Sequence, residues 1–309
     1  GAPDVGQAKA DAMLPVLKAS GRAAAYVVLG DAPVAKDLPE RVRAQGIPFL
    51  RSPERALRAL AHVARYRVLK DRCALPRNTW SGQARTLSGS GALTEPAGKA
   101  LLREAGLSTP EGGVVRSADA AADLAGRIGY PVVLKVVSTD IIHKSDVGGV
   151  AVGLKDEASL RAAWQTMAAR IEAAFPGLEP EGYLVEAMAA PGLEMVVGAR
   201  RDPQWGPVLL VGLGGVWIEA LHDVRLLAAD APQTVVEAEI AALKGRGLLN
   251  GYRGSAAIDI PALAHAVTQV GRLIQSCPQI VEVDVNPLIA YPAGTPPLAL
   301  DALVITGEG

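Results

Sequence analysis

The chain has 309 residues, half of them apolar, and its 31 lysines and arginines nearly balance 32 aspartates and glutamates. This length is sufficient for two domains with cores of their own. A net charge of −1 gives no global case for binding to nucleic acid or to a membrane surface. Cys73 and Cys277 form no CxxC motif and no His/Cys cluster, which excludes a disulfide framework and a zinc site and fits a reducing compartment.

No apolar run reaches the roughly 18 residues of a membrane span, and no signal peptide is visible, so we expect a cytoplasmic protein. Charge is unevenly distributed, because residues 1–80 carry 14 basic and 7 acidic side chains. This imbalance fits two units that attract each other, an anion handled near the basic part, or ordinary solvated helix faces. The chain begins with Gly1 instead of methionine, and we expect a processed fragment or the rear part of a longer polypeptide.

The first 72 residues alternate between strand and helix patterns. Residues 22–30 predict a buried strand, 38–45 a helix, and 47–50 a second short strand. Ser52 is a good N-cap and Pro53 a good first residue for a further helix. This βαβα order predicts part of a doubly wound parallel sheet.

Residues 73–93 are rich in Gly, Ser, Pro and Arg and lack periodicity, so they predict a linker. A second domain then covers residues 94–309. Thr94 caps a helix that stops at Gly106, and alternating strands and helices follow.

The most informative strand contains Lys135. Val132, Leu134 and Val136 point to one side, and the alternate residues, including Lys135, point to the other. Lys135 is the only charge in a run that reads as buried on both faces. A buried ammonium group needs an anion, which is either a nucleotide phosphate or a carboxylate in a structural salt bridge.

The segment after this strand, residues 140–150, contains His143 and the pair Gly148-Gly149. Paired glycines permit movement. An imidazole with a pKa of about 6.5 is mostly neutral at pH 7 and can act as a nucleophile, although a solvated loop histidine is the simpler interpretation.

The wording Leu-Lys-Val-Val-Ser, followed by Ile-His-Lys-Ser-Asp-Val-Gly-Gly-Val, resembles the nucleotide-binding half of the NDP-forming acyl-CoA synthetases. These include ADP-forming acetate–CoA ligase and are related to succinyl-CoA synthetase. The resemblance implies an α/β fold of the ATP-grasp class, preceded by a partial flavodoxin-like domain over residues 1–72. It also implies that Lys135 contacts the nucleotide phosphates and that His143 carries phosphate on a mobile loop.

Residues 183–188 and 193–198 predict two strands joined by a turn, which alone would be an ordinary hairpin. By the resemblance, this segment joins two subdomains and presents backbone groups to the adenine. The implied adenine hinge is Glu186, Ala187 and Met188, and Glu194 is the implied ribose ligand.

A glycine loop follows the strand predicted at residues 206–213. Gly214 and Gly215 would let backbone N–H groups approach phosphate oxygens, but their spacing matches no nucleotide-binding fingerprint, and a tight turn explains them equally well. The family wording nearby favours the phosphate role and implies that Glu219 supports the metal or the histidine loop. Arg253 is a further candidate for phosphate or loop contact, or a residue of a structural turn.

Residues 281–288 place acidic and amide side chains on one face of a strand by their period of two, and Pro287 is expected to end the strand. Asp301 lies in the next predicted strand, residues 298–305. Oxygen ligands from neighbouring strands suit Mg²⁺, although a solvated sheet face is the alternative. The resemblance assigns the metal to Asn286 and Asp301, with Asp284 as support.

The implied reaction is acyl-CoA + ADP + phosphate ⇌ acid + CoA + ATP, with phosphate passing through His143 to ADP. CoA would bind through a companion half that carries the CoA-binding and phosphohistidine domains, on the same longer chain or on a separate subunit. We expect an oligomer that binds ATP or ADP with Mg²⁺ and does not make acyl-CoA unaided. The alternatives are an ATP-grasp ligase that activates a carboxylate directly and a non-catalytic nucleotide-sensing module.

Overall fold

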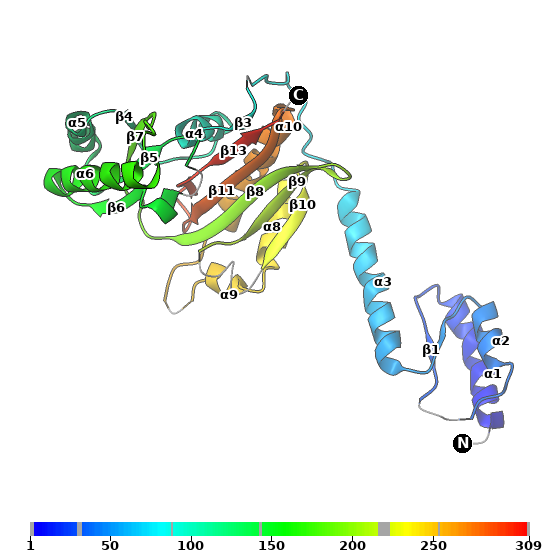
Figure 1. The fold of residues 1–309 in the computed structure, drawn as a ribbon. Helices are drawn as coiled ribbons and strands as arrows, with labels where there is room; N and C mark the ends of the chain where they lie inside the picture. Colours follow the sequence, from blue (N-terminus) through cyan, green and yellow to red (C-terminus); the bar gives the residue numbers. More distant parts are fainter. Residues whose placement is uncertain are drawn as a thin grey trace. The chain divides into compact units, whose positions relative to one another are not determined.

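The computed structural model divides into two compact units, residues 1–75 and 76–309 (Figure 1). It describes residues 3–29, 33–87, 89–141, 144–215, 223–252 and 254–307, with the side chains of residues 3–6 left out. Within these ranges, no helix has the length and apolar composition needed to cross a membrane. The described cysteines, Cys73 and Cys277, are both free thiols.

From residue 22 onward, the first unit has the predicted order of strands and helices, but the helix α1 before them was not predicted. β1 and β2 pair in parallel, with Tyr26 opposite Phe49, as a doubly wound pattern requires. The Ser52 side chain accepts a hydrogen bond from the Arg55 backbone N–H, so the predicted helix cap is confirmed. Among the described side chains of this unit, the buried core cluster contains Ala10, Leu14, Leu38, Val42 and Ile47. The elements are α1 (Pro3–Ala19), β1 (Tyr26–Val27), α2 (Leu38–Ala44), β2 (Phe49–Leu50) and α3 (Pro53–Cys73).

The second unit contains a small antiparallel sheet with the strand order β4-β7-β5-β6. Val132, Leu134 and Val136 pack with α5 and α6 on one face, as the alternation predicts. The other face of the sheet carries Lys135. The elements are β4 (Gly112–Val115), α5 (Ala118–Ile128), β5 (Val132–Val137), the short 3₁₀ helix η1 (Lys144–Val147), β6 (Val150–Leu154), α6 (Glu157–Ala174) and β7 (Gly182–Ala187).

A larger sheet has the strand order β10-β9-β8-β11-β13-β3, with β12 pairing with β11. The main core lies between this sheet and the helices α4, α8 and α10 (Figure 1). The elements are β3 (Gly91–Ala92), α4 (Glu95–Glu104), β8 (Leu193–Asp202), β9 (Gly206–Leu213), β10 (Val224–Ala228), α8 (Gln233–Ala241), α9 (Arg246–Leu249), α10 (Ile260–Ser276), β11 (Ile280–Ala290), β12 (Leu298–Ala299) and β13 (Leu303–Thr306).

Thr94 occupies the N-cap position of α4, but its side chain makes no cap hydrogen bond, so the predicted cap is only positional. Three expectations about strands are wrong. β7 and β8 lie in different sheets, so residues 183–198 are not a hairpin, and the segment after β7 connects the two sheets. Pro287 does not end its strand, because a register shift between Val285 and Leu288 accommodates it and β11 continues to Ala290. The strand predicted over residues 298–305 is interrupted, and Asp301 lies in the break between β12 and β13.

The segment predicted as a linker makes hydrogen bonds within the second unit. The Asn78 backbone N–H donates to the Asp230 carbonyl at 2.7 Å, and the Arg85 backbone N–H donates to the Ser276 carbonyl at 2.8 Å. The Arg272 guanidinium also donates to the Asn78 side-chain oxygen. These contacts fix part of residues 73–93 against α10 and its surroundings, although the segment has almost no regular secondary structure.

Candidate functional site

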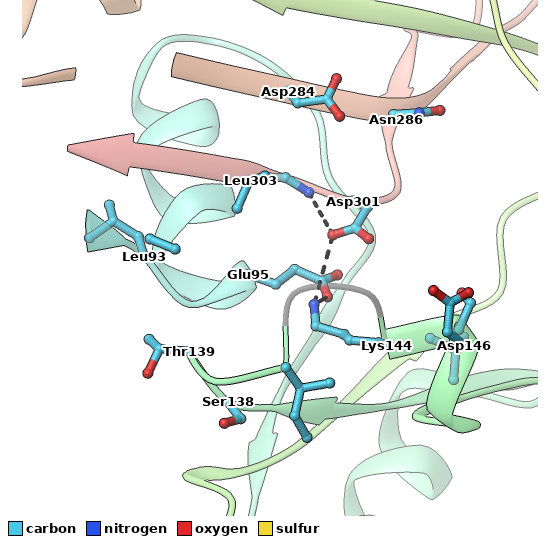
Figure 2. Close-up of a pocket in the computed structure, with 15 residues that line it drawn as sticks. Leu93, Glu95, Ser138, Thr139, Lys144, Asp146, Asp284, Asn286, Asp301 and Leu303 are labelled. Atoms are coloured by element: carbon cyan, nitrogen blue, oxygen red, sulfur yellow. Dashed lines mark hydrogen bonds and ion pairs between the residues drawn. The ribbon is translucent and has the colours of Figure 1, made fainter. Parts of the chain in front are cut away.

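A cavity of about 360 Å³ is lined by residues from both sheets of the second unit. The start of α4, the segment directly after β5, η1, β11 and the β12–β13 connection all contribute to it (Figure 2). Among the described residues that line it, the charged groups are four carboxyl groups and one ammonium group. These are Glu95, Asp146, Asp284, Asp301 and Lys144.

One wall of the cavity contains the predicted metal ligands. Asp284 and Asn286 project from β11, and Asp301 comes from the β12–β13 connection (Figure 2). The strands bring them together because Asp284 is the register partner of Leu303, two residues after Asp301. The Asp301 carboxylate accepts a hydrogen bond from the Ala302 backbone N–H at 2.8 Å. The two predicted ligands, Asn286 and Asp301, and the supporting Asp284 therefore line one cavity.

The chemistry of this wall fits a hard divalent cation. Carboxylate and amide oxygens are the ligands that Mg²⁺ prefers. Burial, together with the negative charges of Glu282 and Asp301, raises the pKa of Asp284, and a cation would relieve this repulsion. Within the described ranges, no group of three or more His, Cys, Asp and Glu side chains is arranged as a metal site, so Asn286 would have to act with two acids.

The opposite side of the cavity rests on α4, whose first residue is Glu95. Glu95 is only 4% exposed, and its carboxylate meets three ammonium groups. Its Oε1 atom lies 2.6 Å from Lys135 Nζ and 2.8 Å from Lys99 Nζ, while Oε2 accepts a hydrogen bond from Lys144. A Cβ atom at Gly98 would lie 3.1 Å from the Ala302 carbonyl oxygen, so α4 lies directly against the β12–β13 connection.

Lys135 has carboxylate partners in this structure. Its Nζ donates to Glu95 Oε1 and to the Leu300 carbonyl oxygen, both at 2.6 Å, and lies 3.4 Å from Glu186 Oε2. The expectation that this buried lysine has a partner is confirmed, in the form of a salt bridge. Its predicted contact with a nucleotide phosphate stays a prediction.

Strand pairing explains why Glu186 joins this cluster. Val133 is the register partner of Glu186, and Lys135 is the register partner of Leu184, so Lys135 and Glu186 share one face of the sheet. Lys99 completes the group by donating to both Glu186 oxygens at 2.7 Å. Lys99 is 2% exposed and Glu186 is 3% exposed. A buried cluster of two acids and two lysines therefore joins α4 to the small sheet.

The charges in this cluster hold Glu95 and Lys135 in their ionised forms. Burial raises the pKa of Glu95, but the charges of Lys135, Lys99 and Lys144 outweigh burial and lower this pKa to about 2. Burial lowers the pKa of Lys135, whereas Glu95 and Glu186 raise it by more, so the net shift is upward. Burial and the neighbouring Lys135 lower the pKa of Lys99, against the opposing effect of the two glutamates.

The predicted adenine, ribose and glycine-loop residues lie away from the lining of this cavity. Ala187 ends β7, and the Met188 backbone N–H donates to the Pro131 carbonyl at 3.0 Å. Gly214 donates its backbone N–H to the Glu194 carbonyl at 2.8 Å. A Cβ atom at Gly215 would lie 2.4 Å from Glu194 Oε2, and the positive φ of 57° at this position favours glycine. The structure thus brings Glu194 and the glycine pair together.

Three predicted residues, His143, Glu219 and Arg253, lie outside the described residues. Three residues that belong to the site were not identified from the sequence: Glu95, Lys99 and Lys144. Glu95 and Lys99 are spaced four residues apart on a helix, and Leu102 follows on the same side. This spacing put two charges on an otherwise apolar face, and it was the available signal.

The chain is similar to proteins that join acids to coenzyme A. A sequence model of the ATP-grasp domain matches residues 85–306. The chain is 40% identical over 280 residues to a trans-feruloyl-CoA synthase from an unknown prokaryotic organism, covering 89% of this chain and 38% of that protein. It is 38% identical over 213 residues to the beta subunit of ADP-forming acetate–CoA ligase I from Pyrococcus furiosus, covering 69% of this chain and 91% of the subunit.

A solved structure gives the same picture. The acetyl-coenzyme A synthetase 1 of Candidatus Korarchaeum cryptofilum, in complex with coenzyme A and Ca-AMPCP, is 37% identical with a TM-score of 0.68. The alignment covers 71% of this chain and 95% of the solved one. The chain spans only about two fifths of the length of the longer curated relatives, 38% and 41% for two of them.

Proposed function

The chain belongs to the ATP-grasp family, in the group that includes the beta subunits of ADP-forming acetate–CoA ligase, and from this premise we propose that it is the nucleotide-binding part of an ADP-forming acyl-CoA synthetase. The proposed overall reaction is acyl-CoA + ADP + phosphate ⇌ acid + CoA + ATP. The single observation that carries the proposal is the cavity between the two sheets. It combines oxygen ligands on one wall with Glu95 and Lys144 on the other, and the buried Lys135 pairs with Glu95 behind that wall.

The wall that carries Asp284, Asn286 and Asp301, which we call the acid wall, favours a nucleotide bound with a metal over a free nucleotide. Four carboxyl groups face the cavity with one ammonium group, so a free polyphosphate would be repelled. We assign Mg²⁺ to Asn286 and Asp301, with Asp284 in support. Bound there, Mg²⁺ would neutralise phosphate oxygens and hold the transferred group in line.

The remaining nucleotide contacts are assigned by position. Residues 186–188 lie where the chain passes from the small sheet to the large one, and their backbone would face the adenine. Glu194, beside Gly214 and Gly215, would bind the ribose, with the glycines near the phosphates. Lys135 reaches a phosphate only by releasing Glu95, Glu186 or the Leu300 carbonyl, and otherwise acts by fixing Glu95.

His143 is proposed as the residue that accepts phosphate from the companion half and passes it to ADP. The companion half supplies the CoA-binding and phosphohistidine domains, either on a longer form of this chain or as a separate subunit. Relatives of both kinds occur, since the feruloyl-CoA synthase is much longer than this chain and the Pyrococcus furiosus protein is a separate beta subunit. We also propose that the assembled enzyme is an oligomer and works in the cytoplasm.

The test is phosphorylation of the full chain with Mg²⁺ and ATP labelled on its terminal phosphate. We expect an acid-labile, base-stable phosphoprotein, because phosphohistidine has this stability. His143→Ala should abolish the label. His62→Ala is the matched control and should retain it, because His62 is exposed on α3, in the other unit.

Other results would favour other functions. ATP turnover with an added carboxylic acid, but without a phosphoprotein, would indicate a ligase that activates the acid directly. Nucleotide binding with neither turnover nor label would indicate a sensing module. Absence of any Mg²⁺-dependent uptake of ADP or ATP in calorimetry would contradict the proposal itself.

A further inference from the structure

The three lysines that meet Glu95 are not equivalent. Lys99 directs its ammonium group at both Glu186 oxygens and at Glu95. Lys135 directs its own at Glu95, Glu186 and the Leu300 carbonyl. An ammonium group has three donors, so protein acceptors occupy the full capacity of both residues. Neither residue lines the cavity.

Lys144 differs on both counts. It lines the cavity, and among the residues with described positions its ammonium group makes one hydrogen bond, to Glu95 Oε2. Its Nζ lies 3.9 Å from Asp301 Oδ1, which is an ion-pair distance beyond hydrogen-bond range. Figure 2 shows the Lys144 side chain extending from η1 toward Glu95 and Asp301. Lys144 therefore retains donors for an anion in the cavity.

Glu95 holds Lys144 in this place. Its Oε1 atom is engaged by Lys99 and Lys135, two residues that are themselves fixed by Glu186. This leaves Oε2 for Lys144. The carboxylate thus connects the buried cluster to the cavity, and its orientation follows from packing in the cluster. A rigid partner lowers the entropy lost when a long lysine side chain is ordered.

We propose that Lys144 is the residue that binds the terminal phosphate of the magnesium nucleotide, and that Glu95 is its positioning residue. This inference rests on the proposed function, since it requires a nucleotide in the cavity. Asp301 would then lie between the two positive charges of the site, the metal and Lys144. The ammonium group acts as a point charge on the phosphate oxygens and offsets the negative charge that the acid wall leaves uncompensated.

The experiment compares the binding of two magnesium nucleotides by calorimetry, with ADP and the non-hydrolysable β,γ-imido analogue of ATP. In Lys144→Met, we expect the affinity for the ATP analogue to fall about 10- to 100-fold, the effect of one charge-assisted hydrogen bond. The affinity for ADP should fall by much less, because ADP lacks the terminal phosphate. Lys144→Arg should recover most of the lost affinity.

Lys155→Met is the matched control, because Lys155 is an exposed lysine shortly after β6, and it should bind both nucleotides like the wild type. Glu95→Gln should reproduce the selective loss in part, with the fold checked by circular dichroism. Equal losses for both nucleotides in Lys144→Met would overturn the inference, because Lys144 would then act through the fold. Unchanged affinities would also overturn it and leave the proposed function standing. If the wild type bound neither nucleotide, the result would contradict the proposed function and, with it, this inference.

Discussion

The helices α3 and α4 begin with the same local pattern but lie in opposite environments. Each follows a hydroxyl residue at the N-cap and has a proline in its first turn. Each also pairs a first-turn glutamate with a basic residue four positions later, Glu54 with Arg58 and Glu95 with Lys99. Arg58 and Glu54 are 69% and 78% exposed, whereas Lys99 and Glu95 are 2% and 1% exposed in their side chains.

This difference shows how burial changes what a local pattern does. On α3 the pair lies in water, where solvent screens it and it contributes little. On α4 the same spacing would be costly if the pair stood alone, since two charges leave water. Lys135 and Glu186 offset this cost, and Lys144 extends the cluster into the cavity. The helix that contributes to the candidate site is therefore α4, whose charged side chains have partners from other elements.

The largest effect is expected from Glu95→Gln, which leaves Lys99 and Lys135 with one carboxylate. Breaking a buried ion pair costs about 3–5 kcal/mol, so the free energy of unfolding should fall by that order. All four tryptophans lie after residue 75, so tryptophan fluorescence in urea reports on the unit that contains Glu95. Glu54→Gln is the matched control on α3 and should change this transition by less than about 0.5 kcal/mol.

The stability lost in Glu95→Gln should depend on pH in a definite direction. The pKa of Glu95 is lowered to about 2 from an ordinary value of 4.5, so its contribution is fully present above about pH 5 and is lost as the pH falls toward 2. This shift corresponds to about 3 kcal/mol. The stability difference between wild type and Glu95→Gln should therefore shrink on acidification. A difference that stayed constant or grew would contradict the ion-pair account.

A somewhat smaller effect is expected from Leu134→Ala, on the apolar face of the lysine strand. Leu134 is fully buried, so truncation should leave a cavity and lower the free energy of unfolding by about 2–4 kcal/mol. Leu57 on α3 is 68% exposed, and Leu57→Ala should cost less than about 0.5 kcal/mol. Urea unfolding followed by circular dichroism measures both, and similar losses would show that α3 is covered in solution.

Substitution of the N-cap residue should affect α3 more than α4, which is the reverse of the order expected for the glutamate substitutions. The Ser52 side chain accepts from the Arg55 N–H, so Ser52→Ala should cost about 1 kcal/mol, seen as faster amide hydrogen exchange in the first turns of α3. Thr94 makes no side-chain cap hydrogen bond, so Thr94→Ala should leave exchange in α4 nearly unchanged. If Thr94→Ala had the larger effect, the cap geometry described for α4 would be wrong.

The smallest effect is expected from Arg58→Ala. It removes an exposed pair at the spacing i, i+4, which stabilises a helix by about 0.2–0.5 kcal/mol. The loss should be halved or abolished in 1 M salt, where screening extends over only about 3 Å. Hydrogen exchange of α3 at low and high salt measures it, and a salt-independent loss above about 1 kcal/mol would contradict a solvated pair.

Much of the local structure was predictable from the sequence. The Ser52 cap, the alternation of Val132, Leu134 and Val136, and the polar face that carries Asp284 and Asn286 all follow from local periodicity. The need of Lys135 for a partner also followed, because a buried ammonium group is costly. These features depend on residues that are close together in the chain.

The missed features depend on residues that are far apart in the chain. Glu95 and Lys135 are 40 residues apart, and Lys99 and Glu186 are 87 apart. The cap, proline and i, i+4 pattern that α3 and α4 share does not distinguish Glu95 from Glu54. The apolar residues on the same face of α4 indicate burial, but the partners of Glu95 come from the sheet that packs on the helix. The misreading of residues 183–198 as a hairpin has the same cause, since only the global topology places β7 and β8 in different sheets.

The central claim is that the cavity between the two sheets takes a magnesium nucleotide. The most direct measurement is a crystal structure of the full chain grown with Mg²⁺ and the β,γ-imido analogue of ATP. We expect a metal at Asn286 and Asp301 and the terminal phosphate within hydrogen-bond distance of the Lys144 ammonium. A nucleotide bound elsewhere on the chain, with this cavity containing only water, would contradict it.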